Sequence, residues 1–491
     1  MKRRVLVASN RGPVSYHFGA DGTLTSRRGG GGLIAGVAEG LAAITPEAEV
    51  SWICAALSDA DRAVAHRRAV CREEPGDVPV RMLDIPPEVF DRAYNNVANS
   101  ILWFIQHLLF DTPNQPQFDR EFRRDWAAYL AYNEAFADAM ADEAAPIVPS
   151  ASVRALIQDY HLSLAPRLLR DKLGGAPARV AHFSHTPWAP PDYYRLLPAE
   201  VGEAVLDGML GADHVGFHAD RWARAFLDCC EAILGAEVSR ADRDANPAGR
   251  VVHRGHVTEV AVHPLGVDAR TLRARAQASD VQAHVAALGE AAGGRKLIVR
   301  VDRTELSKNI VRGLGAYREL LATRPEWHGR VIHLAFAYPS RSAVPEYRAY
   351  TEQVRQIAAE ISAEFRTPDW NPLILEVKDD YPRSLAACAV ADVLLVNPVR
   401  DGMNLVAQEG PVLSEHGCAL VLSREAGAAA TLADAALLVN PYDVSETAAA
   451  LHRALAMPEA ERRRRTEALA ATAAASPPAR WLGDQLASLD R

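Results

Sequence analysis

The stretch RDGMNLVAQE, residues 400–409, places two carboxylates, a glycine and an amide directly after the apolar run ADVLLVNP. A carboxylate binds vicinal sugar hydroxyls well because each of its oxygens accepts hydrogen bonds, so Asp401 is a candidate sugar ligand. A helix beginning near Asn404 would direct its first N–H groups at a phosphate. Leu405 and Glu409 are spaced i and i+4 and share a helix face, so Glu409 can bind a ribose beside the same site. The stretch is typical of half of a sugar-nucleotide site.

Three cations follow two other apolar runs. Arg303 and Lys308 lie in DRTELSKN (302–309), after KLIVRV, and Arg341 lies in YPSRSAVPEY (338–347), after GRVIHLAF. A guanidinium and an ammonium near the start of a helix can hold a diphosphate. Two ordinary surface cations would give the same pattern, and this segment alone favours neither interpretation.

Polar residues also follow predicted strands in the first half of the chain. Asp159 lies in DYHL and His185 in SHTPW, while Arg11 in SNRGP precedes the glycine run RRGGGGL (27–33). Four glycines before a helix let a backbone approach a phosphate closely, although a flexible turn explains them equally well. A single histidine is more often structural, but two polar residues at equivalent strand ends favour a site.

The elements that position these residues are short β-branched runs alternating with helix-length segments, which is typical of an α/β fold with parallel sheets. In the segment 307–325 the apolar residues form one stripe, as in a helix that covers a sheet. Ligands of open α/β sheets bind beyond the carboxyl ends of the strands, where the polar residues above are expected. The predicted strands are 4–9, 50–56, 153–158, 178–184, 213–217, 296–301, 329–336, 373–377, 392–397 and 419–423, with a hairpin over 251–262.

The chain has 491 residues, too many for one ordinary core, so at least two domains are expected. The segment HPLGVD (263–268), with its proline and glycine, predicts the crossing between them. We therefore expect a first domain over 1–265 and a second over 266–472. The tail 473–491, which carries Trp481, is expected to form a last helix that joins the first domain.

Composition excludes several classes of protein. A net charge of −8 gives no footprint for nucleic acid or an anionic membrane, and no apolar window is long enough to span a bilayer. The six cysteines lack metal-binding spacing and indicate a reducing, cytoplasmic compartment. DGTL (21–24) resembles a phosphatase motif but lacks the nucleophilic carboxylate. No DxD motif follows a strand in a setting suited to Mn²⁺ or Mg²⁺, so we expect no metal and no cofactor.

Nine segments, in chain order over roughly residues 5–440, together resemble the trehalose-6-phosphate synthase family of retaining glycosyltransferases: SNRGP, GGGGL, YNNVANSILW, DYHL, SHTPW, VGFH, DRTELSK, PSR and RDGMNLVAQE. This resemblance implies a GT-B architecture, with two Rossmann-like domains facing a deep cleft, and transfer without a metal. The implied reaction moves glucose from UDP- or GDP-glucose to glucose 6-phosphate and retains the anomeric configuration. The product is α,α-trehalose 6-phosphate.

The resemblance also assigns roles to residues. Those similar to the family's acceptor ligands are Arg11, Tyr94, Trp103, Asp159 and Arg341. Those similar to its donor ligands are Gly32, Asp401, Gly402, Met403, Asn404, Leu405 and Glu409. Asp159 corresponds to the carboxylate at the acceptor hydroxyl, and His185 to the residue beside the transferred sugar. Arg303 and Lys308 would stabilise the leaving diphosphate, which itself helps to take the acceptor proton.

The chain departs from the family in two places. The usual RLDYSKG reads RTELSKN here, with Asn309 in place of glycine. The segment TPDWNPLILEVKDDY (367–381) differs from the common uridine-binding version and leaves the donor nucleotide open among UDP, GDP and ADP.

Two other functions compete with the synthase. A pseudo-glycosyltransferase would join a nucleotide-cyclitol to a cyclitol phosphate, but intact RDGMN and Tyr94 favour glucose 6-phosphate. A non-catalytic sugar-phosphate sensor is opposed by intact Arg303, Lys308, Asp401 and Glu409. No phosphatase half is present, so a separate phosphatase is expected downstream, and a homo-oligomer is compatible with the sequence.

Overall fold

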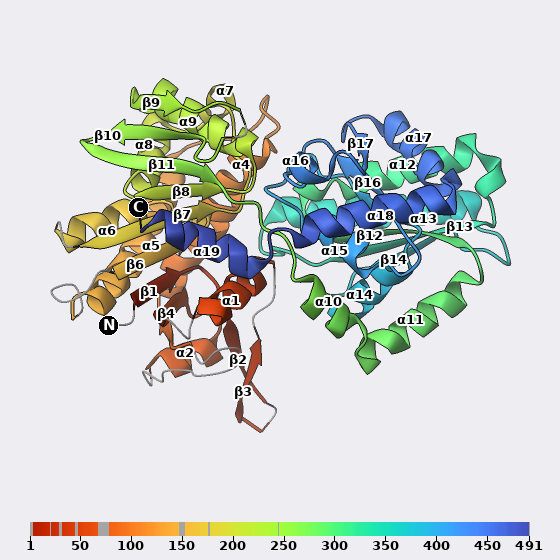
Figure 1. The fold of residues 1–491 in the computed structure, drawn as a ribbon, viewed down its shortest axis with the longest axis horizontal. Helices are drawn as coiled ribbons and strands as arrows, with labels where there is room; N and C mark the ends of the chain where they lie inside the picture. The colour runs from red at the N-terminus through yellow and green to blue at the C-terminus, as the bar shows by residue number, and fades with distance from the viewer. Residues whose placement is uncertain are drawn as a thin grey trace. The chain divides into compact units, whose positions relative to one another are not determined.

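The computed structural model describes residues 3–19, 21–28, 32–44, 48–66, 78–146, 153–174, 177–243 and 245–490. The chain divides into two compact units, each with its own sheet and core (Figure 1). The first unit comprises Met1–Leu265 and Pro478–Arg491, and the second comprises Gly266–Pro477.

The first unit contains a nine-stranded sheet in the order β5-β4-β1-β6-β7-β8-β11-β10-β9. From β5 to β11 all neighbours are parallel, and β10 runs antiparallel to both β11 and β9. The chain moves outward from β1 through β4 to β5, then returns to β6 on the other side of β1. The strands are β1 (Arg3–Ala8), β4 (Ala48–Ala55), β5 (Val80–Leu83), β6 (Val153–Gln158), β7 (Ala178–Ser184), β8 (His214–Phe217), β9 (Glu237–Arg240), β10 (Gly249–His253) and β11 (His256–Val262).

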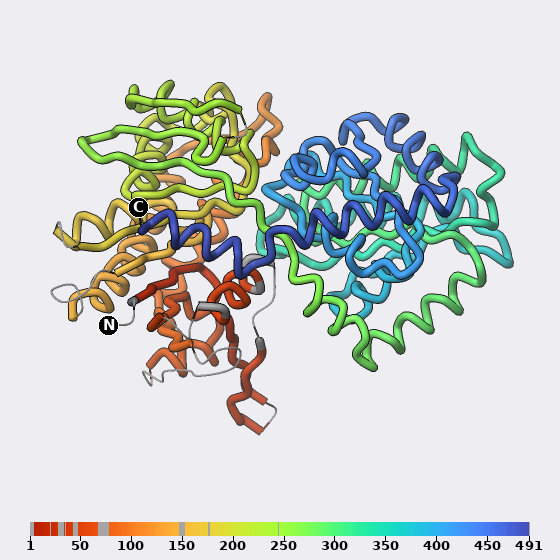
Figure 2. Tube along the Cα trace, viewed as in Figure 1, coloured from red at the N-terminus to blue at the C-terminus, as the bar shows by residue number. Residues whose placement is uncertain are grey.

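Helices and a separate hairpin complete the first unit. The hairpin consists of β2 (Val14–Phe18) and β3 (Leu24–Arg28). Helix α19, the last of the chain, packs against α1, and Figure 2 follows this C-terminal segment back to the first unit. The helices are α1 (Gly32–Ile44), α2 (Asp59–His66), α3 (Pro87–Asp91), the π-helix η1 (Arg92–Leu102), α4 (Trp103–His107), α5 (Arg120–Ala144), η2 (Tyr160–Leu162), α6 (Ala165–Leu173), α7 (Pro191–Tyr194), α8 (Ala199–Met209), α9 (Asp220–Leu234) and α19 (Pro478–Ser488).

The second unit contains a six-stranded parallel sheet in the order β14-β13-β12-β15-β16-β17. Here the chain moves outward from β12 to β14 and returns to β15 beside β12, which is the strand order of a Rossmann sheet. The strands are β12 (Lys296–Arg303), β13 (Val331–Tyr338), β14 (Leu373–Glu376), β15 (Val393–Val396), β16 (Ala419–Ser423) and β17 (Leu437–Val439).

Helices cover both faces of this sheet. The predicted stripe of the segment 307–325 is confirmed, because Ile310, Leu314, Tyr317, Leu320 and Leu321 of α12 are buried in the core of the unit. The helices are α10 (Ala269–Ala276), α11 (Ser279–Ala292), η3 (Leu306–Lys308), α12 (Ile310–Thr323), η4 (Pro325–Trp327), α13 (Pro345–Phe365), α14 (Tyr381–Val390), α15 (Val406–Leu413), α16 (Ala429–Leu432), α17 (Val444–Ala456) and α18 (Glu459–Ala474).

The C-terminal boundary of the second unit lies at Pro477, later than the predicted 472. Ala473 belongs to the core of the second unit, so a boundary at 472 would divide a buried helix. The N–H groups of Gly266 and Val267 also donate to the carbonyls of Ser476 and Ala473. The tail that joins the first unit is therefore α19 with its flanking residues, not the whole of 473–491.

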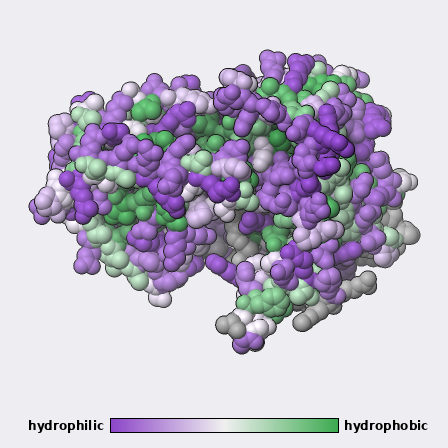
Figure 3. Space-filling model, turned by 180° about the vertical axis from the view of Figure 1, so that it is seen from behind, coloured by the Kyte–Doolittle hydropathy of each residue, from purple (hydrophilic) through white to green (hydrophobic). Residues whose placement is uncertain are grey.

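The apolar residues are concentrated in the two cores. Hydrophilic residues predominate on the face shown in Figure 3, with smaller hydrophobic patches between them. In the described part of the chain no helix combines the length and apolarity that a membrane crossing requires.

Candidate active site

The carboxyl ends of β12 and β15 bring together three of the predicted donor-side residues. Arg303 is the last residue of β12, Lys308 ends the short helix η3, and Asp401 follows β15. The Nζ of Lys308 lies 2.5 Å from Oδ2 of Asp401, and each side chain is only 14% exposed. Because the strand order reverses between β12 and β15, this is the point at which a Rossmann sheet binds its ligand.

Lys308 remains a cation at this site. Burial opposes its charge, but three neighbouring carboxylates, Asp401 first, outweigh burial and raise the pKa of the ammonium above its ordinary value. The buried Arg300 fixes the backbone of Lys308: it donates to the Lys308 carbonyl at 3.0 Å and to the Asp302 carboxylate at 2.7 Å. The ammonium therefore has a fixed position and a fixed charge.

Glu305 is a site residue that the sequence analysis did not single out. Its fully buried carboxylate lies 3.1 Å from Nη1 of Arg303 and 3.6 Å from Nη1 of Arg341. The hydroxyl of Ser340 donates to it at 3.0 Å. Burial would raise the pKa of Glu305, but Arg303, Arg341 and Lys308 lower it to about 2, so the carboxylate stays ionised. The available signal was an acid between two cations in RTELSKN.

Asn309, the residue that replaces the family's glycine, adopts a left-handed conformation with φ of 57°. Glycine is the usual residue there, and asparagine is the side chain that tolerates it best. The Asn309 amide also donates to the carbonyls of Asn397 at 3.0 Å and Pro441 at 2.7 Å. The substitution thus keeps the backbone turn that carries Lys308 into α12.

The residues Asp401–Leu405 form a tight loop before α15, which begins at Val406, two residues after Asn404. Asn404 has a φ of 79°, donates to Asp401 at 3.1 Å and accepts from the N–H of Ala407 at 3.3 Å. Its side chain therefore ties Asp401 to the first turn of the helix.

The chain after β16 supports this loop from behind. The N–H of Gly427 donates to the Asp401 carbonyl, and that of Ala428 donates to the Met403 carbonyl. A Cβ at Gly427 would lie 1.8 Å from the carbonyl oxygen of Gly402, so only glycine fits. Met403 is buried, while Leu405 and Glu409 are half-buried at the start of the helix.

In the first unit the corresponding reversal of strand order lies between β1 and β6. Asp159 follows β6 with a φ of 74°, and Arg11 follows the neighbouring strand β1 and is exposed. A non-glycine residue at such a φ is held there by its surroundings and marks a constrained site. Here the Asp159 N–H donates to the Phe183 carbonyl at 2.7 Å, and the Asp159 carboxylate accepts from the N–H of His185 at 3.2 Å.

His185 lies directly beside Asp159, as predicted for residues at neighbouring strand ends. Its Nε2 lies 2.9 Å from Oε1 of Gln158, and its Nδ1 lies 3.3 Å from Nε2 of His218. Burial, with smaller contributions from His218 and His182, holds the pKa of His185 well below its ordinary value. The ring is therefore neutral at physiological pH.

Tyr94 and Trp103 both face the short helix η2 that follows Asp159. Tyr94, on the π-helix η1, stacks on the His161 ring at 5.4 Å, and Trp103 lies 5.5 Å from the Tyr160 ring. Nδ1 of His161 is 4.0 Å from the Asp159 carboxylate. π-Helical segments occur often at functional sites, and this one carries Tyr94 and ends directly before Trp103.

The glycine run is only partly within the described residues. Residues 29–31 lie outside them, and Gly32 is the first residue of α1. The predicted contact of Gly32 with phosphate therefore stays a prediction. Among the residues with a described placement, no group of three or more His, Cys, Asp or Glu could hold a metal ion.

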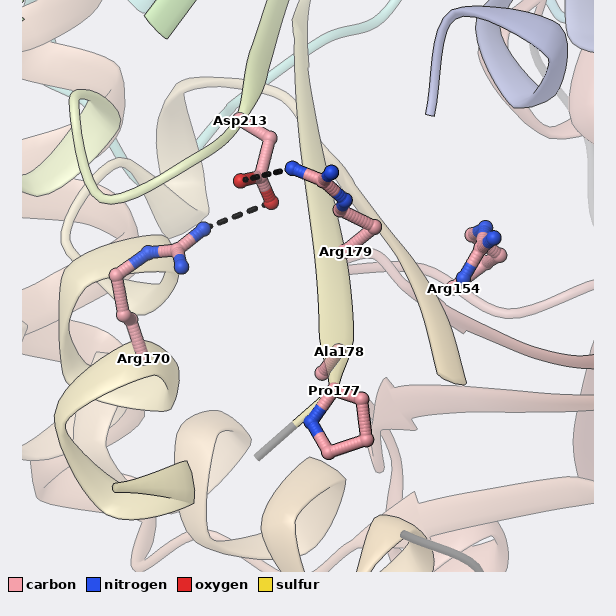
Figure 4. A pocket seen from close by; sticks show the side chains of 6 residues that line it. All are labelled: Arg154, Arg170, Pro177, Ala178, Arg179 and Asp213. Atoms are coloured by element: carbon pink, nitrogen blue, oxygen red, sulfur yellow. Dashed lines mark hydrogen bonds and ion pairs between the residues drawn. The ribbon is translucent and has the colours of Figure 1, made fainter. Parts of the chain in front are cut away.

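A pocket of about 340 Å³ lies at the opposite, amino edge of the first sheet (Figure 4). Its arginines are paired: Arg170 and Arg179 with Asp213, and Arg154 with Asp490. The predicted site residues lie at the carboxyl ends of the strands, so this pocket is separate from the candidate active site.

The model of glycosyltransferase family 20 matches residues 3–491. The UDP-forming α,α-trehalose-phosphate synthase of Schizosaccharomyces pombe is 33% identical over 467 residues, which cover 94% of this chain and 85% of that protein.

Two solved structures with ligands are also similar over nearly the whole chain. The trehalose-6-phosphate protein from E. coli, bound with UDP-2-fluoro glucose, has a TM-score of 0.83 at 27% identity and covers 99% of both chains. The UDP-forming α,α-trehalose-phosphate synthase from Burkholderia xenovorans, in complex with glucose-6-phosphate, has a TM-score of 0.82 at 26% identity and covers 100% of both.

Proposed function

This chain belongs to glycosyltransferase family 20, and from that premise we propose that it is an α,α-trehalose-6-phosphate synthase. Its α/β fold is of the GT-B class. The proposed reaction transfers glucose from a nucleoside diphosphate glucose to glucose 6-phosphate, with retention of the anomeric configuration. The observation that carries the proposal is the buried Lys308–Asp401 pair, with Arg303 beside it, where the strand order of the second sheet reverses.

The donor binds the second unit in this proposal. The first N–H groups of α15 and the loop Asp401–Leu405 hold the sugar and the phosphates, Glu409 accepts from the ribose, and Gly32 of the first unit contributes backbone to a phosphate. Arg303 is half exposed and Lys308 is largely buried, so one cation is accessible while the other is fixed.

Transfer proceeds on one face of the sugar, which retains the configuration. As the glycosidic bond breaks, negative charge grows on the diphosphate, and Arg303 and Lys308 stabilise it. The diphosphate oxygen then takes the proton of the attacking hydroxyl. Cations fixed before the reaction need no reorganisation as the charge develops, which makes such stabilisation a large catalytic contribution. The proposal needs neither a metal nor a cofactor.

The acceptor is proposed to bind Arg11, Tyr94, Trp103 and Asp159 in the first unit. Arg11 binds the phosphate together with the aromatic pair, and Asp159 accepts from the hydroxyl that becomes glycosylated. Neutral His185, held by Gln158 and His218, lies beside the transferred sugar in this proposal. Arg341, in the second unit, is proposed as a further ligand of the acceptor phosphate.

The donor nucleotide is proposed to be UDP or GDP. UDP is supported by the relatives, which are named UDP-forming synthases. GDP is kept because the segment 367–381 departs from the usual uridine-binding sequence; within it, Trp370 is buried and its indole N–H donates to the Val331 carbonyl at 2.7 Å.

We further propose a cytoplasmic location, because Cys229, Cys230, Cys388 and Cys418 are buried free thiols. The product would stay phosphorylated until a separate phosphatase acts on it.

The test is to incubate the protein with glucose 6-phosphate and UDP-, GDP- or ADP-glucose in turn, and to measure the nucleoside diphosphate released. We expect release with UDP- or GDP-glucose and a product that NMR identifies as α,α-linked. Release from none of the donors would contradict the proposal and favour a cyclitol substrate or a sensing role.

A further inference from the structure

Glu305 connects two arginines that come from neighbouring strands. Arg303 ends β12 and is paired in the sheet with Tyr338, the last residue of β13, and Arg341 lies just beyond Tyr338. The Glu305 carboxylate is within ion-pair distance of both guanidinium groups, with Oε1 toward Arg303 and Oε2 toward Arg341. One fully buried acid therefore faces two cations that have different proposed ligands.

The backbone around Glu305 fixes the position of its carboxylate. The N–H of Thr304 donates to the Tyr338 carbonyl, and the N–H of Lys308 donates to the Glu305 carbonyl at 3.0 Å. Ser340 adds its hydroxyl to Oε1. Glu305 therefore has little freedom to move, and the guanidinium groups that pair with it are held in place as well.

The two arginines depend on Glu305 to different degrees. Within the described chain, Glu305 is the acid that lies within ion-pair distance of Arg303, whose side chain is 53% exposed. An exposed guanidinium with one partner takes its rotamer from that partner. Arg341 is nearly buried, has a φ of 45° and also donates to the Tyr347 hydroxyl at 2.7 Å, so it has a second anchor.

The net charge of these side chains favours an anionic ligand. Glu305 carries one negative charge and faces two guanidinium groups, so these three side chains together have a net charge of one positive unit. The Lys308–Asp401 pair is neutral and does not change this excess. Because the pKa of Glu305 is lowered to about 2, its carboxylate is ionised at physiological pH and offsets one of the two guanidinium charges. A phosphate group can approach the exposed Arg303 without displacing its buried anchor.

We propose that Glu305 is a positioning residue that holds Arg303 and Arg341 at a fixed separation, and so sets the distance between the donor diphosphate and the acceptor phosphate. This inference rests on the proposed function, in which the two arginines bind those two groups. Glu305 itself touches neither substrate. Its role is to keep two cations, which would otherwise repel each other, in the arrangement that transfer requires.

The experiment compares Glu305→Gln, Glu305→Asp and a matched control, Asp392→Asn. Asp392 is also a carboxylate between two cations of the second unit, 2.6 Å from Nζ of Lys296 and 3.2 Å from Nη1 of Arg462. It precedes β15 and so lies at the amino end of that strand, away from the candidate site. For each variant, kcat, both KM values and the affinity for inorganic pyrophosphate by calorimetry are measured, and circular dichroism checks folding.

Glu305→Gln is expected to raise both KM values and to lower kcat, each by roughly 10- to 100-fold, because a displacement of about 1 Å in a positioned group has this effect. Its pyrophosphate affinity should fall as well. Glu305→Asp keeps the charge and matches the family's RLDYSKG, so it should recover most of the activity. Asp392→Asn should leave all of these quantities near the wild-type values.

Two results would overturn the inference. One is folded Glu305→Gln with wild-type KM values and pyrophosphate affinity, and the other is a loss no larger than that of Asp392→Asn. The proposed function fails separately, if the wild-type protein turns over no donor. In that case, weaker pyrophosphate binding by Glu305→Gln would still support its positioning of Arg303.

Discussion

Arg303 is the cation on which the proposed transfer depends most directly, since it is both accessible and paired with a fixed acid. Arg303→Ala is expected to lower kcat about 10²- to 10³-fold, as the loss of one preorganised partner of a developing negative charge does. The melting temperature should fall as well, because the fully buried Glu305 loses the nearer of its two guanidinium partners. The matched control is Arg318→Ala, an exposed arginine of the same unit that pairs with Glu360 and Glu364. Normal turnover by Arg303→Ala would remove this residue from the mechanism.

His333 provides a second test at the residue scale, through the dependence of stability on pH. It is fully buried in β13 against Tyr317, and burial, helped by the Arg300 charge, lowers its pKa to about 3. The folded ring is neutral between pH 3 and 6.5, whereas the unfolded chain binds a proton there, so stability is lost as pH falls through this window. The slope from one such group approaches about 1.4 kcal/mol per pH unit.

His333→Phe should therefore make the free energy of unfolding of the second unit fall less steeply between pH 6.5 and 4. Urea denaturation at several pH values measures this slope. His416→Phe, at an exposed histidine of the same unit, is the control and should follow the wild type. If His333→Phe also follows the wild type, burial of His333 does not contribute to acid sensitivity.

At the scale of elements, the interior strands were predictable, whereas of the edge strands only β14 was predicted. β6, β7 and β16 have the predicted bounds, because strands buried on both faces read as nearly continuous apolar runs. β9 and β17 were missed: they are short strands at the edges of their sheets, and β9 is largely exposed. The π-helix η1 also has no sequence signal of its own, since its residues fit an ordinary helix.

The candidate site divides in the same way. Lys308, Asp401 and Arg303 were predictable because each follows a recognisable strand, and parallel strands bring their carboxyl ends together. Glu305 was missed because its importance depends on Arg341, which is distant in sequence and becomes its neighbour only through the pairing of β12 with β13. Local patterns place single residues at a sheet edge, but they do not show which of these residues contact one another.

The turn between η3 and α12 gives a prediction at the element scale. Asn309 combines a left-handed backbone with two side-chain hydrogen bonds, so two variants separate these contributions. Asn309→Gly should lose about 1 kcal/mol of stability from the hydrogen bonds, partly offset by relief of strain. Asn309→Ala keeps the strain and loses the bonds, and should cost about 2–3 kcal/mol. Denaturation curves measure both; equal losses would show that the left-handed backbone is not the deciding factor.

At the scale of the whole molecule, the last helix joins a unit from which it is separated in sequence by the entire second unit. Trp481 of α19 is buried, packs edge-on against Phe183 at 5.0 Å and lies 5.6 Å from the His185 ring. A Cβ at Gly40 of α1 would lie 2.7 Å from Cβ of Leu482, so the two helices approach as closely as glycine allows. The tail is therefore part of the core that supports His185.

Trp481→Ala is accordingly expected to destabilise the first unit by about 3–5 kcal/mol, the usual cost of removing a buried tryptophan side chain. Turnover should fall as well, because His185 loses one of the rings that orient it. Two units with separate cores should give two calorimetric transitions. Only the transition of the first unit should shift to a lower temperature. The control is Trp327→Ala, at a buried tryptophan of the second unit whose indole N–H donates to His452 at 3.0 Å, and it should move only the other transition. If both variants shift the same transition, the tail is not bound to the first core alone.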